Sequence, residues 1–346
     1  MQPFKNFIPA FANLLNAVTV DGISSNAYAT QYLQTLLQHK LHYLNIYATV
    51  LEKAFAARNN TEVALLDFGT GNGLLALFAK YCGVQKVFAS DLSEPFLVAA
   101  QQLSKATNIE IDGWVLGDEN ALINYFSNQH LDIVVGTDVI EHIYNLDAFF
   151  STLQQINSSI ITVFTTASVS ENYFKARQLK KLQIQDELVD SNAFQNGMNN
   201  EFAGVSFIEV RKKIIANHQP KLNNEIIQLL AEKTRGLNKV DIEKAVDHYL
   251  QNNVLPKTTN HPTNTCDPIT GSWTERLLTI KEYRALYLRH DKILLVHYGF
   301  YNSSAKGLKS LFASVLNVAL QCAGNGAIYF TPFTILEGVP RKKLSQ

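Results

Sequence analysis

Short apolar runs alternate with helix-like stretches between residues 63 and 166, and this alternation limits the fold more than any other feature of the chain. The runs have the length and composition of buried strands, and they cover residues 63–68, 86–90, 109–116, 131–135 and 160–164. The stretches with helical spacing lie at residues 74–81, 95–106, 119–126 and 146–156. Because parallel strands are usually joined by a helix, the alternation predicts an α/β fold with a mostly parallel sheet and helices on both faces.

The rest of the chain divides around this core, residues 61–166. Residues 1–60 predict an N-terminal helical cap, with one helix over residues 24–58. Residues 167–275 break the alternation and predict a helical insertion, which we expect to form a lid and the substrate region. Residues 276–346 resume the α/β pattern and bring the sheet to seven strands. The elements expected there are helices at 279–289 and 305–320, a strand at 293–298 and a last strand opening at 327–330.

The composition narrows the classes of partner. Hydrophobic residues make up 47% of the 346 residues, and 30 Lys and Arg balance 30 Asp and Glu. A neutral chain has no bulk attraction for phosphate backbones, so nucleic acid is not expected as a partner. Three widely spaced cysteines favour neither a disulfide framework nor a thiolate zinc site, and a cytoplasmic location is expected. No uninterrupted apolar stretch approaches 18 residues, so we expect no membrane partner.

A glycine-rich turn directly follows the first apolar run. Gly69, Gly71 and Gly73 alternate with other residues, and Asp67 precedes them. Glycines allow a ligand to approach bare backbone, and the following helix N-terminus adds amide donors. In a dinucleotide-binding loop the third glycine comes one place later, and a carboxylate at position 67 would repel a diphosphate. The turn therefore favours a ligand that carries an ammonium group and no phosphate, such as S-adenosylmethionine (SAM).

The order of four motifs resembles the class I SAM-dependent methyltransferases, including the ubiquinone-type and methyltransferase-domain families. Their acidic-x-Gly-x-Gly-x-Gly motif stands at residues 67–73. In that family an acidic residue ends the second strand and holds the ribose hydroxyls, and Asp91 has this place. Another acidic residue follows the third strand near the adenine, as Asp118 does. The segment Asp-Val-Ile-Glu-His-Ile at residues 138–143 resembles the Val-Leu-Glu-His-Val signature of the family.

The resemblance implies a Rossmann-like class I methyltransferase fold with SAM as cofactor and S-adenosylhomocysteine as product. It covers residues 63–166, and the closing strands are compatible with it, whereas the insertion is not covered. The cofactor-binding residues that it implies are Asp67, Gly69, Thr70, Gly71, Gly73, Asp91, Leu92, Asp118, Glu119 and Thr137.

Catalytic candidates follow the fourth strand at Asp138, Glu141 and His142. Three interpretations stay open. Glu141 and His142 start the next helix and have a structural role, or His142 acts as general base toward an acceptor hydroxyl. In the third interpretation all three residues hold a divalent cation, because their spacing resembles a Glu-x-x-Glu-His metal cluster. We expect no metal.

The insertion carries aromatic and basic residues with two possible roles each. The aromatic residues could line an acceptor pocket, but a core of the insertion itself is the favoured interpretation. For Arg211, Lys212 and Lys213 we favour a solvated surface over a contact with an anionic substrate. A turn-rich segment at residues 266–276 could fold over the active site, and its Trp273 is expected to be a packing residue. The residues considered for the pocket are Tyr173, Phe174, Arg177, Phe194, Phe202 and Phe207.

The sequence thus predicts a methyltransferase that acts on a small-molecule acceptor, with oxygen as the expected attacking atom. The alternatives are a protein or peptide methyltransferase, a catalytically silent SAM-binding scaffold and a nicotinamide-dependent oxidoreductase. The oligomeric state stays open.

Overall fold

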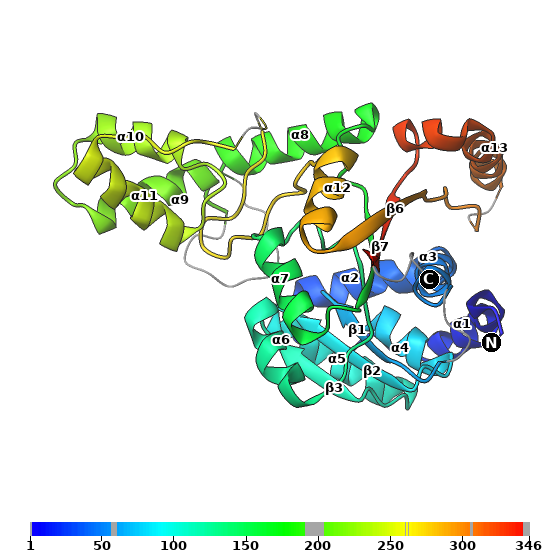
Figure 1. The fold of residues 1–346 in the computed structure, drawn as a ribbon. Coiled ribbons are helices and arrows are strands. Elements are labelled where there is room, and N and C mark those ends of the chain that lie inside the picture. The colour runs from blue at the N-terminus through cyan, green and yellow to red at the C-terminus, as the bar shows by residue number, and fades with distance from the viewer. Residues whose placement is uncertain are drawn as a thin grey trace. The chain divides into compact units, whose positions relative to one another are not determined.

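The computed structural model describes residues 2–56, 61–190, 204–259, 261, 263–304 and 307–341 (Figure 1). The chain forms two compact units. The first comprises Met1–Ile140, Leu146–Ala167 and Ile280–Gln346, and the second comprises Glu141–Asn145 and Ser168–Thr279.

A seven-stranded sheet forms the centre of the first unit, with strand order β3-β2-β1-β4-β5-β7-β6. The first five strands run parallel, whereas β7 is antiparallel to both β5 and β6. This arrangement confirms the predicted fold class, a Rossmann-like sheet of the class I methyltransferases. The strands are β1 (Ala64–Phe68), β2 (Lys86–Asp91), β3 (Gly113–Leu116), β4 (Ile133–Thr137), β5 (Ile161–Thr166), β6 (Lys292–Tyr298) and β7 (Thr334–Pro340).

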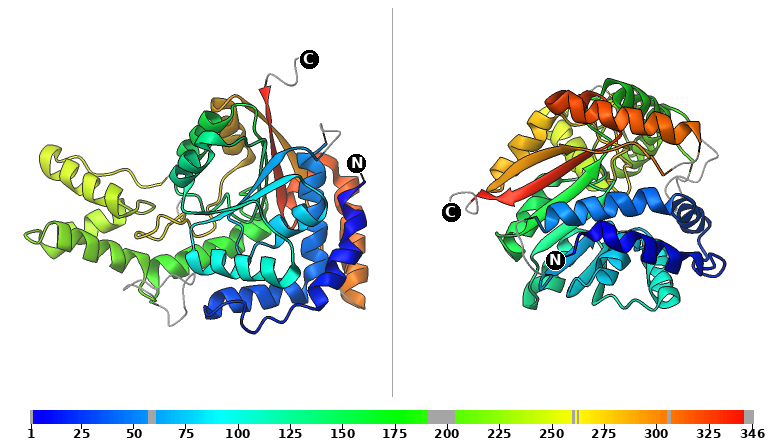
Figure 2. Two further views of the ribbon diagram at one scale, coloured as in Figure 1. Left: turned by 90° about the horizontal axis from the view of Figure 1, so that it is seen from below. Right: turned by 90° about the vertical axis from the view of Figure 1, so that its right-hand side faces the viewer.

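Helices cover both faces of the sheet because side chains along each strand alternate between them. On one face, Leu65 and Val163 share a core with residues of the first five helices, of which the N-terminal ones are blue in Figure 2. On the other face, Phe149 contacts Phe68 and Phe164, with ring centroids 4.7 and 5.9 Å apart. The helices of this unit are α1 (Ile8–Asn16), α2 (Ala27–Gln38), α3 (Lys40–Ala54), α4 (Leu74–Tyr81), α5 (Glu94–Thr107), α6 (Glu119–Tyr125), α7 (Leu146–Ile156), α12 (Ile280–Arg289) and α13 (Leu308–Ala323).

The helix expected over residues 24–58 and the strand expected to open at 327–330 differ from the structure. The single helix expected over residues 24–58 is two helices, because His39 leaves helical geometry between α2 and α3. No glycine or proline marks that break, so the sequence gives no signal for it. The run at 327–330 is not a strand but part of a 3₁₀ turn, Gly324–Tyr329, in which the Phe330 N–H donates to the Ala327 carbonyl.

The third strand is shorter than its apolar run. It begins at Gly113, whereas the run begins at residue 109. Helix α5 ends at Thr107, and the following residue, Asn108, has the left-handed conformation. The Asp112 carboxylate then accepts a hydrogen bond of 2.8 Å from the Val87 N–H, in place of a carbonyl of the neighbouring strand.

The second unit contains four helices among its described residues. They are α8 (Tyr173–Leu188), α9 (Phe207–His218), α10 (Asn224–Lys233) and α11 (Lys239–Asn252). Apolar side chains of α9, α10 and α11 form a core of their own, which includes Ile215, Leu230 and Ile242.

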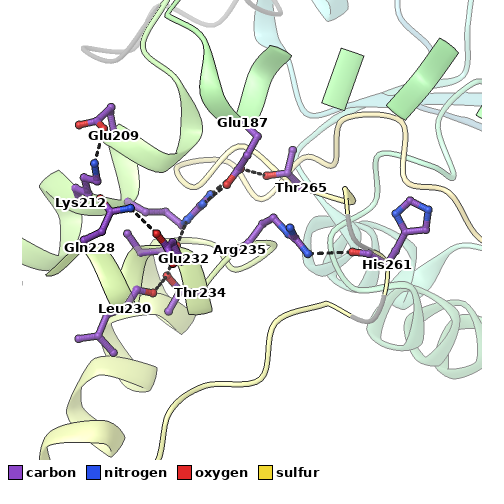
Figure 3. A network of polar contacts seen from close by, with 12 residues as sticks. Glu187, Glu209, Lys212, Gln228, Leu230, Glu232, Thr234, Arg235, His261 and Thr265 are labelled. Carbon is purple, nitrogen blue, oxygen red and sulfur yellow. Dashed lines mark hydrogen bonds and ion pairs between the residues drawn. The ribbon is translucent and has the colours of Figure 1, made fainter. Parts of the chain in front are cut away.

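Arg211 corrects the expected solvated surface. Its side chain is completely buried, and its guanidinium donates to both carboxylate oxygens of Glu187 and, over 2.8 Å, to the Ala231 carbonyl. Glu187 also accepts from the Thr265 hydroxyl over 2.7 Å (Figure 3). Lys212, one residue on, bonds Glu209 near the surface. Of Arg211 and Lys212, the buried cation is therefore the one whose carboxylate partner is bidentate.

The aromatic residues of the insertion do not share one environment. Phe207 is buried, as expected of a core residue, whereas Tyr173 and Phe174 at the start of α8 are 65% and 70% exposed. Phe194 and Phe202 lie outside the described residues.

The buried ion pair gives a stability prediction. Glu187→Gln leaves the Arg211 charge buried without its counter-charge, and we expect the free energy of unfolding to fall by about 3–5 kcal/mol. Glu209→Gln, which removes the partly exposed pair with Lys212, should change it by less than about 1 kcal/mol. Urea denaturation of both variants measures the difference, and equal small losses would contradict the assignment.

Candidate functional site

The glycine turn between β1 and α4 needs its glycines for two reasons. Gly69, Gly71 and Gly73 have φ of 67°, 54° and 78°, where residues with a Cβ are strained. Neighbours also leave no room for a side chain. A Cβ on Gly69 would overlap the Val139 side chain, and one on Gly73 would lie 2.8 Å from the Ala100 Cβ. The turn thus presents bare backbone at the carboxyl end of β1.

The buried side chain of Asp67 stabilises this turn through hydrogen bonds. One of its carboxylate oxygens accepts from the Thr70 hydroxyl over 2.6 Å and from the Ala76 N–H of α4 over 3.1 Å. Burial raises the pKa of Asp67 to about 7, with a smaller contribution from the charge of Asp91, while the two hydrogen bonds oppose the shift. Asp67 therefore exchanges a proton near neutrality.

Asp91 connects the ends of β1 and β2. Its two carboxylate oxygens accept hydrogen bonds of 2.8 Å from the Gly71 and Ser93 N–H groups. Burial raises its pKa, and these backbone bonds oppose the rise. Each oxygen keeps a second lone pair, so the carboxylate can still accept hydroxyl donors. Leu92 beside it is half exposed.

Asp118 begins α6 as its N-terminal cap. One carboxylate oxygen accepts from the Asn120 N–H over 3.0 Å, and the other accepts from the Asn120 side-chain amide over 3.1 Å. The preceding Gly117 N–H donates to the Asp91 carbonyl over 3.0 Å, which ties this loop to the end of β2. Glu119 is partly buried, and that burial raises its pKa.

Helix α2 covers the glycine turn, and this part of the site was not predicted from the sequence. A Cβ on Gly71 would lie 3.4 Å from the Tyr32 ring. The Asn72 side-chain amide donates to the Ala29 carbonyl over 3.2 Å. Tyr28 and Tyr32 both meet Phe96 of α5 edge to face, with centroids 5.6 Å apart. Tyrosines four residues apart on one helix share a face, and that spacing is the signal that could have indicated a covering helix.

Asp138 follows Thr137, the last residue of β4. It has a φ of 51°, and its N–H donates to the Thr165 carbonyl over 3.1 Å. Burial raises the pKa of Tyr32 and Tyr43, and in each case the Asp138 charge is the next largest contribution. The side chains of both tyrosines thus lie within the field of this carboxylate.

Glu141 and His142 belong to the second unit, where the segment around Trp273 fixes them. The Arg276 N–H donates to the Glu141 carbonyl over 3.2 Å, and the Trp273 N–H donates to the His142 carbonyl over 3.1 Å. His142 Nδ1 lies 2.7 Å from the Trp273 carbonyl oxygen. A carbonyl can only accept, so Nδ1 carries a proton. In the neutral ring the lone pair is then on Nε2.

Among the described residues, no three His, Cys, Asp or Glu side chains gather as a metal-ligand group. Asp138 belongs to the first unit and Glu141 and His142 belong to the second, and the expectation that these residues hold no metal stays a prediction. The second unit also holds a cavity of about 380 Å³, lined in part by Glu187, Gln228 and Arg235. None of the predicted site residues lines this cavity.

A family model described as a methyltransferase domain matches residues 37–233, more than half of the chain. The chain belongs to this methyltransferase family. The family expected from the motifs is thus confirmed, and membership implies SAM-dependent methyl transfer.

Relatives of this methyltransferase are distant. The ribosomal protein L11 methyltransferase of Hydrogenovibrio crunogenus is 26% identical over 101 residues, which cover 29% of this chain and 32% of the relative. The chain thus matches about a third of the length of this curated relative.

Similar solved structures include methyltransferases and a protein named without an activity. The magnesium protoporphyrin IX methyltransferase from Synechocystis PCC 6803, with bound SAH, is 12% identical, with a TM-score of 0.39 and coverage of 96% of both chains. The YcgJ protein of Bacillus subtilis is 10% identical, with a TM-score of 0.41 and coverage of 84% of this chain and 97% of that one.

The raised pKa of Asp67 predicts a pH dependence of stability. The native methyltransferase binds more protons at this group than the unfolded chain does between about pH 4 and pH 7. The contribution of Asp67 to stability is therefore full below that range and is lost as the pH rises through it. Asp67→Asn carries no such charge, so its melting temperature relative to the wild type should rise by about 2–6 °C between about pH 5 and pH 8.

Thermal denaturation without ligand checks this prediction, and Asp118→Asn, at an exposed carboxylate, is the control. A constant difference between Asp67→Asn and the wild type across the pH range would show that Asp67 does not titrate as described.

Proposed function

We propose that this methyltransferase transfers a methyl group from SAM to a hydroxyl oxygen of a small-molecule acceptor, and that the glycine turn with Asp91 holds the cofactor. One observation carries the cofactor site. The Asp91 carboxylate, bonded to the Gly71 N–H, stands beside a turn of three left-handed glycines at the ends of β1 and β2. Open α/β sheets bind ligands at this edge.

The residues present fit SAM better than a dinucleotide. The Asp67 carboxylate lies at the turn, where it disfavours a diphosphate and suits a cationic amino-acid ligand. Asn72 Oδ1 is buried beside the turn and accepts no hydrogen bond from the described residues, so it offers an acceptor for a ligand donor. Asp91 would accept the ribose hydroxyls, and Asp118 would lie near the adenine.

The bound cofactor supplies a methyl group that its sulfonium already activates, so the protein has to orient the acceptor and take up one proton. His142 is the base in this proposal. The Trp273 carbonyl holds the Nδ1 proton and leaves Nε2 to accept the proton of the acceptor hydroxyl. The tyrosines of α2 cover the cofactor turn, and this cover supports a small acceptor.

Exposed aromatic residues support a second candidate, a protein substrate. Tyr173 and Phe174 project from the first turn of α8, and exposed aromatic side chains are typical of protein-docking surfaces. Loss of methyl transfer to a protein substrate in a Tyr173→Ser, Phe174→Ser variant, with SAM affinity intact, would favour this candidate.

Asp91→Ala tests the cofactor site. We expect the affinity for SAM to fall at least about tenfold, because a charge-assisted hydrogen bond contributes about 1.5–3 kcal/mol. The matched control is Asp112→Ala. Asp112, which directly precedes β3, also accepts a backbone N–H, but from Val87 near the start of β2, whereas Asp91 is the last residue of β2. Isothermal titration calorimetry with SAM and with NAD separates the outcomes. Unchanged SAM affinity in Asp91→Ala, or tight binding of NAD, would overturn the assignment.

His142→Ala tests the base. Turnover should fall by about 10²–10⁴-fold, while SAM affinity stays within about twofold of the wild type. His248→Ala, at an exposed histidine of α11, should change neither. Release of S-adenosylhomocysteine with a pool of hydroxylated metabolites measures turnover. A loss confined to SAM binding would place His142 at the cofactor, and no turnover in the wild type with any acceptor would favour a silent SAM-binding scaffold.

A further inference from the structure

Helix α13 packs on the protein with the side that has its smaller and more polar residues. Ala313 and Leu320 are its buried residues, and Ser310 and Asn317 lie on the same side. Asn317 accepts from the Tyr301 N–H over 2.7 Å and donates to the Tyr301 carbonyl over 3.0 Å. This is the reverse of an ordinary surface helix, whose polar side faces water.

The outward side of α13 is apolar. Six large apolar side chains on it are between 43% and 74% exposed, and they are Leu308, Leu311, Phe312, Val315, Leu316 and Val318. Tyr329 and Phe330, just beyond the helix, are also exposed. Figure 1 shows α13 beyond the end of β6. Contiguous apolar patches of this kind mark interaction surfaces in proteins.

The helix cannot cross a bilayer as it stands in this fold. Residues Leu308–Tyr329 have the length and mean hydropathy of a membrane-spanning segment, but α13 itself has 16 residues and is about 24 Å long, shorter than the ~30 Å hydrocarbon core. The segment also leaves the sheet at Tyr298 and returns at Thr334, and these two residues are paired neighbours. Both ends of the segment therefore stay on one side of any membrane, and the helix can only lie flat.

Charge around the helix suits a lipid surface. The chain has no Asp or Glu from residue 292 to residue 336, and Lys309 stands in the first turn of α13. An apolar face with aromatic residues near its end and no negative charge matches the interfacial region of a bilayer that contains anionic lipid.

The area of the patch fits a membrane better than a second copy of the chain. The outward half of a helix about 24 Å long and about 10 Å wide presents on the order of 400 Å². A stable protein interface buries about 800 Å² on each partner, so self-association through α13 alone falls short. Insertion into lipid has no such minimum, because its strength scales with the apolar area that is buried.

We propose that α13 attaches this methyltransferase to the surface of a phospholipid bilayer, with the helix lying flat and its apolar side in the headgroup and acyl boundary. The proposal replaces the expectation of no membrane partner, which counted only uninterrupted apolar residues. It is compatible with the expected cytoplasmic location, since the protein would sit on the membrane from that side.

A fluorophore on Cys322 tests the proposal in the full chain. Cys322 is the exposed cysteine of α13, whereas Cys82 and Cys266 are buried. A nitrobenzoxadiazole label there should brighten and shift to the blue when vesicles of phosphatidylcholine with phosphatidylglycerol are added. Phe312→Gln with Val315→Gln removes two exposed apolar side chains, and we expect it to weaken vesicle binding at least about tenfold.

Val240→Gln with Leu250→Gln is the matched control, since it exchanges two exposed apolar residues of α11 and should leave vesicle binding unchanged. Analytical ultracentrifugation without lipid gives the second arm, where the wild type should show the mass of one chain. Each of three results would overturn the proposal. The first is a label fluorescence that does not change when vesicles are added. The second is vesicle binding by the Phe312→Gln, Val315→Gln variant that equals that of the wild type. The third is self-association of the wild type that the same variant abolishes.

Discussion

The hydrogen bond between the Gly71 N–H and the Asp91 carboxylate is the interaction on which the candidate cofactor site depends. It connects a turn that only glycine can adopt with the end of the neighbouring strand. Gly117 then ties the third loop to the same strand end through the Asp91 carbonyl. One residue thus gathers the loops after β1, β2 and β3 at one edge of the sheet, and the buried Asp67 braces the turn from inside.

Local sequence patterns were sufficient to predict the glycine turn, the acidic residues at the strand ends and most of the fold. The alternation of runs and helices reflects burial of parallel strands, which depends on neighbouring residues and can be read along the chain. The glycines and the acidic residues at the strand ends were predictable for the same reason. The wrongly predicted elements lie where no residue type in the sequence indicates the actual structure. The break at His39 has neither glycine nor proline, and the apolar run at 327–330 has the composition of a strand but forms a 3₁₀ turn.

Long-range contacts decided what the sequence could not show. The cover over Gly71 comes from Tyr32, about forty residues earlier. His142 owes its tautomer to a carbonyl 131 residues later. The burial of Arg211 depends on Glu187, whose carboxylate Thr265 also contacts. Each of these groups looks ordinary in its own segment, so their roles emerge only from the tertiary structure.

The direct pairing of Tyr298 with Thr334 makes the segment between β6 and β7 a separable module. The pairing of β6 with β7 reaches Tyr298 and Thr334, and one further hydrogen bond follows it, from the Gly299 N–H to the Phe333 carbonyl. A tight turn that joined Tyr298 directly to Thr334 would close the hairpin and keep all seven strands. Helix α13 can in this sense be removed from this chain, or transplanted onto another antiparallel pair, without a change in the order of the sheet.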